Sequence, residues 1–143
     1  MYYIVYLSTA TQLMSDEELK EILVVSNANN RNLNVTGMLL YHEGSIVQVI
    51  EGEEETLRTL YTKIERDSRH RGIIKLSEGK LDQRNFPDWS MGFRTVSASE
   101  FAQIAGYQNV NNKSLFKPSP DQPDHNVLII LRTFYQTNIA RFL

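Results

Sequence analysis

A primary amide stands in the middle of an apolar stretch of this sequence. Gln48 has β-branched residues on both sides within 45–52, a pattern typical of a largely buried strand. Its side chain carries two N–H donors and an acceptor carbonyl, and leaving them unpaired in a core costs about 1–3 kcal/mol. Spacing alone favours a surface glutamine on a half-exposed strand. The alternative is that Gln48 faces a polar ligand held inside the fold.

Further polar side chains are predicted near Gln48 in space. If the face of the sheet that holds Gln48 is covered by two helices, these groups surround the space between the helices. Such a space suits a flat heterocycle, with amides along its edge and cations for a phosphate tail. Taken singly, the same residues indicate only a strand aromatic, helix ends and solvated charges. They are Tyr6, Ser8, Asn29, Asn30, Lys63, Arg69 and His70.

The elements that must position these groups follow from hydrophobic periodicity. Ser15 and Glu18 form a capping-box pattern, so a helix is expected from there to the asparagines of 27–30. The chain then predicts a β-α-β-β-α-β-β order, which is an α+β, ferredoxin-like sheet with two helices on one face and one added strand. The strands are expected at 2–7, 35–41, 46–50, 73–81 and 92–96, and the second helix at 53–67.

The C-terminal third is expected to cover the other face of the sheet with helices. Ser97 and Glu100 give a second capping-box pattern, 106–114 is predicted to be a polar loop, and 118–123 is rich in proline. An apolar stripe from Val127 to Phe142 predicts a final amphipathic helix. The sequence therefore divides into a ligand-binding domain over 1–97 and a helical extension over 98–143 for output or oligomerisation.

Composition excludes several function classes. The chain has 143 residues, a net charge of −2 and 41% apolar residues, which indicates one globular domain without a footprint for nucleic acid. It has no cysteine, and its three histidines lack metal-ligand spacing, so thiolate chemistry and a metal site are not expected. No signal peptide or membrane-spanning run is recognisable, which predicts a cytoplasmic protein that does not enter the membrane.

Two other ferredoxin-like functions are disfavoured by missing residues. The central strand at 46–50 has neither the aromatic nor the basic side chains that RNA-binding domains of this topology use. The first loop, 7–12, has no arginine to hold a phosphate in the manner of an acylphosphatase.

The sequence resembles the BLUF family, blue-light sensors that use flavin, over about residues 3–96. Each matching piece is weak alone, but their order and distances together are specific. The pieces are Ile4 to Ser8, Ser26 to Asn30, Val35 to Tyr41, Val47 to Gly52, Asp67 to His70, and Trp89 to Met91.

The resemblance implies a role for each matching residue. Tyr6 is the expected photoactive phenol and Gln48 the switching amide, while Trp89, Met91 and Ser8 are expected to take part in switching. Lys63 stands where the family often has arginine. A compact ammonium charge therefore replaces the two-pronged guanidinium near the phosphate end of the cofactor. The residues expected to bind the cofactor are Asn30, Asn29, Gln48, Tyr6, Ile22, Leu39, Lys63, Ile64, Arg69 and His70.

The resemblance also implies a mechanism. The phenol of Tyr6 gives an electron to the excited flavin and then a proton, and Gln48 turns or shifts its tautomer, which changes the hydrogen bonds at the flavin edge. We therefore expect a non-enzymatic photoreceptor with non-covalent FAD, or FMN as an alternative, in a homo-oligomer that acts on an unknown protein effector. The alternatives are a ferredoxin-like interaction module without photochemistry and a small flavin redox enzyme, for which the sequence offers no nicotinamide site.

Overall fold

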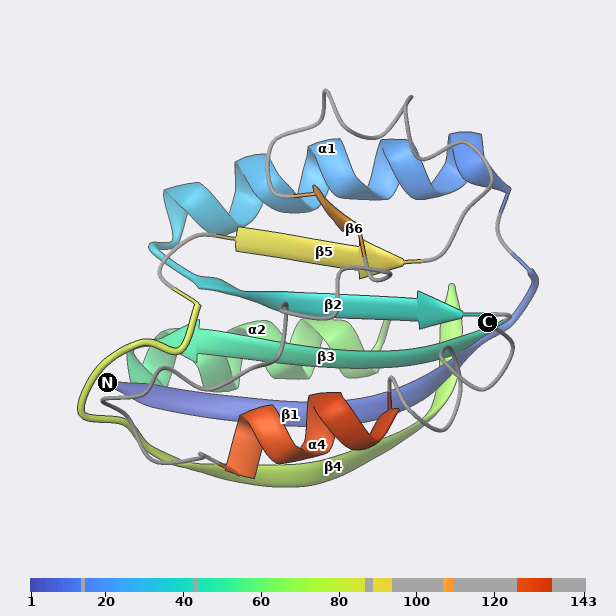
Figure 1. The fold of residues 1–143 in the computed structure, drawn as a ribbon. Coiled ribbons are helices and arrows are strands. Elements are labelled where there is room, and N and C mark those ends of the chain that lie inside the picture. Colours follow the sequence, from blue (N-terminus) through green and yellow to red (C-terminus); the bar gives the residue numbers. More distant parts are fainter. Residues whose placement is uncertain (14, 43, 87–88, 94–106, 110–125, 135–143) are drawn as a thin grey trace.

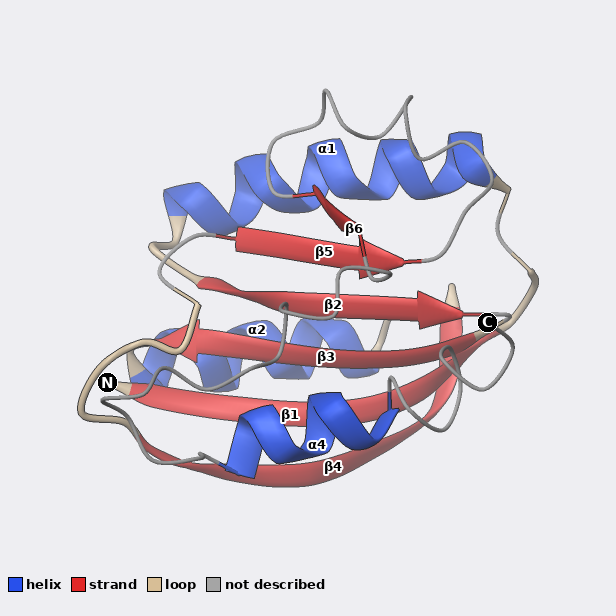
Figure 2. Ribbon diagram, in the orientation of Figure 1, coloured by secondary structure: helices blue, strands red, loops and turns tan. Residues whose placement is uncertain are grey.

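The computed structural model describes residues 1–13, 15–42, 44–86, 89–93, 107–109 and 126–134. These residues form one mixed sheet with helices on both sides (Figures 1 and 2). Its strand order is β4-β1-β3-β2-β5-β6. The elements are β1 Tyr2–Ala10, α1 Asp16–Asn32, β2 Thr36–His42, β3 Ser45–Gly52, α2 Glu54–Glu65, β4 His70–Lys80, β5 Trp89–Phe93, β6 Tyr107–Asn109 and α4 Asn126–Phe134.

The first four strands give the ferredoxin-like arrangement that the sequence predicts. β1 lies between β3 and β4 and is antiparallel to both, and β2 continues the sheet beyond β3. The added strand β5 joins the outer side of β2 in parallel. The predicted fold class is therefore confirmed.

Local signals explain where α1 begins and ends. Ser15 is the N-cap: its hydroxyl accepts from the Glu18 N–H at 3.2 Å while the Glu18 carboxylate accepts from the Ser15 N–H, so the predicted capping box is present. The helix continues through Asn32, beyond the predicted end at 27–30. It stops where Asn34 takes a left-handed conformation with φ of 55°, which asparagine tolerates better than most residues.

Alternation along the strands divides the core into two layers on either side of the sheet. Ile4, Ile50 and their neighbours face α1 and α2 and pack on residues such as Leu57. Val47, Val49 and the residues of the same parity face α4. The expectation that a C-terminal helix covers the second face is correct for α4.

The C-terminal strands differ from the sequence-based expectation. The last strand was expected at 92–96, but β5 begins at Trp89, because its backbone pairs with β2 from Gly37 onward. The polar loop expected at 106–114 is wrong for Tyr107–Asn109, which pair in parallel with β5 as β6. Sheet pairing overrides the low strand propensity of asparagine there. The helix predicted from Ser97, and the final helix beyond Phe134, lie outside the described residues.

One glycine is required where β2 meets β3. A Cβ built on Gly37 would overlap the carbonyl oxygen of Val49. Gly37 is paired with Ile50 on one side and with Trp89 on the other. This close backbone approach sets β3, β2 and β5 side by side.

Candidate functional site

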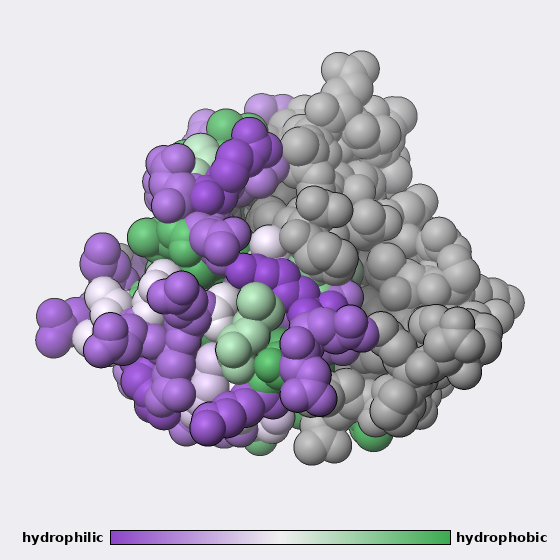
Figure 3. All heavy atoms as spheres, turned by 90° about the vertical axis from the view of Figure 1, so that its left-hand side faces the viewer, coloured by the Kyte–Doolittle hydropathy of each residue, from purple (hydrophilic) through white to green (hydrophobic). Residues whose placement is uncertain are grey.

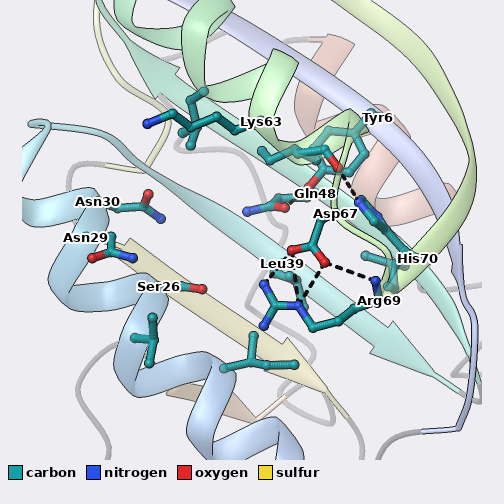
Figure 4. A pocket seen from close by; sticks show the side chains of 15 residues that line it. Tyr6, Ser26, Asn29, Asn30, Leu39, Gln48, Lys63, Asp67, Arg69 and His70 are labelled. Carbon is teal, nitrogen blue, oxygen red and sulfur yellow. Dashed lines mark hydrogen bonds and ion pairs between the residues drawn. The ribbon is translucent and has the colours of Figure 1, made fainter.

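A cavity of about 300 Å³ lies between α1 and α2, over the sheet face that carries the first core layer (Figure 4). All ten residues that the sequence assigns to cofactor binding line it. Apolar side chains supply much of its wall, and amides and charges gather at its edges. The lining residues are Tyr6, Ile22, Val25, Ser26, Asn29, Asn30, Leu39, Ile46, Gln48, Leu60, Lys63, Ile64, Asp67, Arg69 and His70.

Tyr6 and Gln48 face each other on neighbouring strands at the floor of this cavity. They are register partners of β1 and β3, and their side chains are 2% and 8% exposed. The Tyr6 hydroxyl donates a hydrogen bond to Gln48 Oε1. Burial, with smaller contributions from Tyr61 and Asp67, raises the pKa of Tyr6 well above its ordinary value. Tyr6 therefore stays protonated at neutral pH and acts as the donor in this pair.

The other end of the Gln48 amide points into the cavity, as does the amide of Asn30 across from it (Figure 4). Asn30 is 5% exposed. Within the described residues, neither Gln48 Nε2 nor the Asn30 side chain has a hydrogen-bond partner. Buried polar groups are almost always paired in native proteins. The two amides therefore fit a ligand with polar groups along the edge of a flat, otherwise apolar body, which is what the isoalloxazine of a flavin presents.

Ser8 does not line the cavity but contacts a residue that does. The Nε2 of His70 donates to the main-chain oxygen of Ile64 at 2.6 Å. In the neutral imidazole, Nδ1 is then the acceptor, and the Ser8 hydroxyl donates to it at 2.9 Å. The ring of His70 lies 6.3 Å from that of Tyr6 at an interplanar angle of 65°. Ser8 thus orients His70 beside Tyr6.

The charges at the cavity rim are of two kinds. Arg69 is paired with Asp67, and its Nε lies 3.0 Å from both carboxylate oxygens. Hydrogen bonding from Arg69 lowers the pKa of Asp67 to about 2, although burial opposes the shift. Lys63 is exposed on α2 and forms no ion pair within the described part of the chain. It is therefore available to an anionic group at the mouth.

A second tyrosine packs against Tyr6 on the side of β4. The ring of Tyr61, on α2, lies edge-on to that of Tyr6, with 5.7 Å between centroids and 67° between planes. The Lys75 ammonium stands over the Tyr61 ring at 4.8 Å from its centroid, a cation–π geometry. Tyr6 is thus flanked by Tyr61 and by His70.

Sequence reasoning missed five of the lining residues: Val25, Ser26, Ile46, Leu60 and Asp67. Signals for most of them were available. Ile46 has the parity of Gln48, Leu60 precedes Ile64 by four residues, and Ser26 precedes Asn30 by four. Asp67 also had a local signal, because it stands two residues before Arg69 and its carboxylate accepts from the Arg69 N–H and Nε.

The predicted switch pair Trp89 and Met91 is placed through its backbone. Four backbone positions form a row across adjacent strands. Tyr6 pairs with Gln48, Gln48 with Leu39, and Leu39 with Met91. The row connects the cavity floor to β5, which is the strand expected to carry the switch.

Together, the fold and the cavity define a ferredoxin-like ligand-binding domain with an amide-lined site between two helices. The model of the BLUF family, "Sensors of blue-light using FAD", matches residues 1–92. The chain belongs to the BLUF family, a class of flavin-based light sensors. The predictions of family, of flavin as ligand and of blue-light sensing are thereby confirmed.

Similar proteins agree with this assignment. Photoactivated adenylate cyclase subunit beta from Euglena longa is 34% identical over 87 residues, which are 60% of this chain and 10% of that protein. The dark-state structure of the BLUF protein BlrB is 28% identical, with a TM-score of 0.60 over 73% of this chain and 85% of that one. A bacterial light-regulated adenylyl cyclase is 29% identical, with a TM-score of 0.62 over 99% of this chain and 34% of that one.

The chain spans about a tenth of the length of such curated cyclase relatives. None of the helices within the described residues is long and apolar enough to cross a bilayer. The described residues also contain no group of three or more histidine, aspartate or glutamate side chains that could hold a metal ion.

Proposed function

We propose that the chain binds FAD non-covalently in the cavity between α1 and α2 and signals blue light through the Tyr6–Gln48 pair. The observation that carries this proposal is the half-paired amide of Gln48. Its oxygen is held by Tyr6, while its nitrogen points into the cavity without a partner among the described residues. One side chain therefore connects the protein to the ligand edge.

When bound, the flavin absorbs blue light and accepts an electron from a nearby donor. Tyr6 is suited to that role because its phenol lines the cavity and its O–H already points at an acceptor that can take the proton. Both the electron and the proton then return to Tyr6, so that the phenol and the ligand regain their oxidation states. Gln48 has unlike ends, so turning the amide or shifting its tautomer presents an acceptor where a donor had been. The Tyr6 hydroxyl can accept from the turned amide, but its own proton then has no acceptor among the described residues. The dark arrangement is therefore the more stable one, and the change reverses.

The remaining lining residues have binding roles in this proposal. Ile22, Leu39 and Ile64 pack on the ring faces, and the Asn30 amide, with Asn29 beside it, pairs with the polar edge. Arg69 and His70 close the end near Tyr6. Lys63 lies at the mouth, where it supplies one point charge to a phosphate. FAD is the cofactor that the family description names, and FMN is the alternative.

Output in this proposal runs through β5 and the C-terminal extension. Trp89 and Met91 lie on the strand that ends the row from Tyr6, and residues 98–143 form the output or oligomerisation element. Exposed apolar side chains on the other face of the sheet support an oligomerisation role. α4 covers that face, yet Ile129 remains 45% exposed and Leu76 of β4 remains 43% exposed. A homo-oligomer, an unknown protein effector and a cytoplasmic location belong to the same proposal.

An absorption spectrum of the purified protein, recorded before and after blue light, tests the proposal. We expect a yellow protein whose flavin band shifts reversibly to the red. Gln48→Leu should keep the flavin and lose the shift, and Tyr6→Phe should keep the flavin and lose the photocycle. A colourless protein that does not take up added flavin contradicts the proposal and favours an interaction module without photochemistry. A normal shift in Gln48→Leu removes Gln48 from the mechanism.

A further inference from the structure

The β3 strand carries a second buried polar residue three positions after Gln48. Glu51 is 0% exposed and has the opposite parity, so it faces the α4 side of the sheet, away from the flavin cavity. Its Oε1 accepts from the Phe86 N–H at 2.7 Å, and its Oε2 accepts from the Asn85 N–H and from Asn85 Nδ2, both at 3.0 Å. Both oxygens of this carboxylate are thus committed to one short segment.

The same segment is held a second time by an arginine. Arg84 Nη1 donates to the Glu51 main-chain oxygen at 2.9 Å and to Thr36 Oγ1 at 2.6 Å, and its Nη2 donates to the Asn34 main-chain oxygen at 2.8 Å. These bonds fix residues 84–86 to the end of β3 and to the start of β2. Hydrophilic side chains dominate the described surface at this end of the sheet (Figure 3), yet the Glu51 carboxylate lies wholly buried beneath it.

Fixing residues 84–86 has a consequence for the strand that follows. β5 starts at Trp89, three residues after Phe86, and its first backbone pair is Trp89 with Gly37, the residue next to Thr36. Anchoring residues 84–86 restricts the register in which β5 can pair with β2. Each residue of register shift would move the strand about 3.3 Å along β2, away from that anchor. The observed register sets Met91 against Leu39 and hence in the row of Gln48.

We propose that Glu51 is a positioning residue for the light response, because it anchors residues 84–86 and thereby fixes the register of β5 beside the Tyr6–Gln48 row. This inference rests on the proposed function in one respect, namely that β5 senses the change at Gln48. Glu51 touches neither the cavity nor the Tyr6–Gln48 bond. Its loss should therefore leave the spectral shift intact and alter how long the shifted state lasts.

Glu51→Gln tests the inference in the flavin-loaded protein. Glutamine keeps an acceptor for the Phe86 N–H but turns an N–H₂ group toward the two donors of Asn85. We expect amide hydrogen exchange in 84–86 and 89–93 to become about tenfold faster. We also expect an unchanged size of the red shift and recovery of the dark spectrum about fivefold faster, the factor of one lost hydrogen bond.

Glu55→Gln is the matched control, because it removes the same charge from an exposed position on α2. It should behave as wild type in both measurements. Wild-type exchange in β5 together with wild-type recovery in Glu51→Gln overturns the inference. If that variant does not fold, Asn85→Ala, which removes only the side-chain donor, must show the same changes at smaller size, and their absence again overturns it. A wild-type protein without any red shift refutes the proposed function instead, while the exchange in β5 still decides whether Glu51 anchors the strand.

Discussion

Gln48 and Glu51 are both buried polar residues of β3, and they meet opposite conditions on the two faces of the sheet. Glu51, facing α4, has three N–H donors on its two oxygens. Gln48, facing α1 and α2, has one partner for its oxygen and, within the described residues, none for its nitrogen. One residue is therefore saturated by the protein itself, whereas the other is left with capacity for a ligand.

This difference in hydrogen bonding gives the two residues of β3 different roles: one holds the structure and the other can change. A saturated carboxylate has one low-energy arrangement, since any movement breaks charge-assisted hydrogen bonds. A half-paired amide can take a second arrangement once a ligand edge is present, although the one in which Tyr6 donates to its oxygen is the more stable. The α4 face of β3 is thus built to hold the chain, and the cavity face is built to change.

Removing the saturated group should cost the most stability. Glu51→Ala leaves the donors of Asn85 and Phe86 buried without an acceptor, and we expect the free energy of unfolding to fall by about 3 kcal/mol. Urea unfolding of the flavin-free protein measures this. A loss below about 1 kcal/mol would show that the segment 84–86 finds other partners and that the contrast is weaker than described.

Replacing one member of the Tyr6–Gln48 pair should lower the free energy of unfolding, whereas replacing both members should change it little. In flavin-free protein, Tyr6→Phe leaves Gln48 Oε1 without its donor, and Gln48→Leu leaves the Tyr6 hydroxyl without its acceptor. We expect each to lower the free energy of unfolding by about 1–2 kcal/mol, and the double variant to lie close to wild type. A double-mutant cycle by urea unfolding measures the coupling. Simple additivity of the two losses argues against a functioning hydrogen bond between them.

The contributions of the Asp67 and Glu51 carboxyls to the free energy of unfolding should change with pH in opposite directions. The pKa of Asp67 is lowered to about 2, so its contribution is present above its unfolded value of 3.8 and is lost as pH falls through about 2. Burial raises the pKa of Glu51, although the N–H groups of Phe86 and Asn85 offset part of the shift. The folded protein therefore binds the Glu51 proton more tightly, and ionisation of Glu51 lowers stability as pH rises above its unfolded value of 4.5.

Unfolding measured at a series of pH values in two variants separates these contributions. Asp67→Asn should lose about 1 kcal/mol or less at pH 7, because Arg69 is largely exposed, and should match wild type below about pH 2. Glu51→Gln should remove the decline above pH 4.5. Parallel pH profiles for wild type and Asp67→Asn would show that the Asp67–Arg69 pair does not form in solution.

The smallest effect is expected at the cavity mouth. Lys63 is exposed, so its charge should strengthen binding of a flavin phosphate only modestly. Lys63→Gln should weaken FMN and FAD binding about two- to fivefold and leave riboflavin binding unchanged, as measured by fluorescence titration. Equal weakening for riboflavin would place Lys63 at the ring instead of at the phosphate.

Local signals in the sequence predicted most of the fold, and the failures have a physical pattern. The Ser15–Glu18 capping box and the apolar run around Gln48 are contained in short segments, so the sequence predicted the helix start and the buried strand correctly. The surface position that spacing alone favoured for Gln48 is wrong, because its side chain is 8% exposed. The start of β5 depends on pairing with Gly37, and β6 depends on β5, so neither could be obtained from local propensity. Glu51 could not be found locally for the same reason, because its partners Asn85 and Phe86 lie far along the chain, whereas Asp67 is bonded to Arg69 only two residues away and was within reach of local reasoning. The ten cavity residues were assembled by resemblance, and their roles toward flavin remain predictions.

The cation over Tyr61 bears on where an oxidising equivalent can reside. Tyr6 and Tyr61 are neighbouring phenols in edge-on contact, so an electron vacancy formed on one could pass to the other. The ammonium of Lys75 lies over the Tyr61 ring and makes removal of an electron from that ring less favourable. Among the residues that the structure describes, no amide accepts from the Tyr61 hydroxyl as Gln48 does from Tyr6. In the proposed mechanism, the vacancy would therefore stay on Tyr6, beside Gln48, and would not pass to Tyr61 and toward β4.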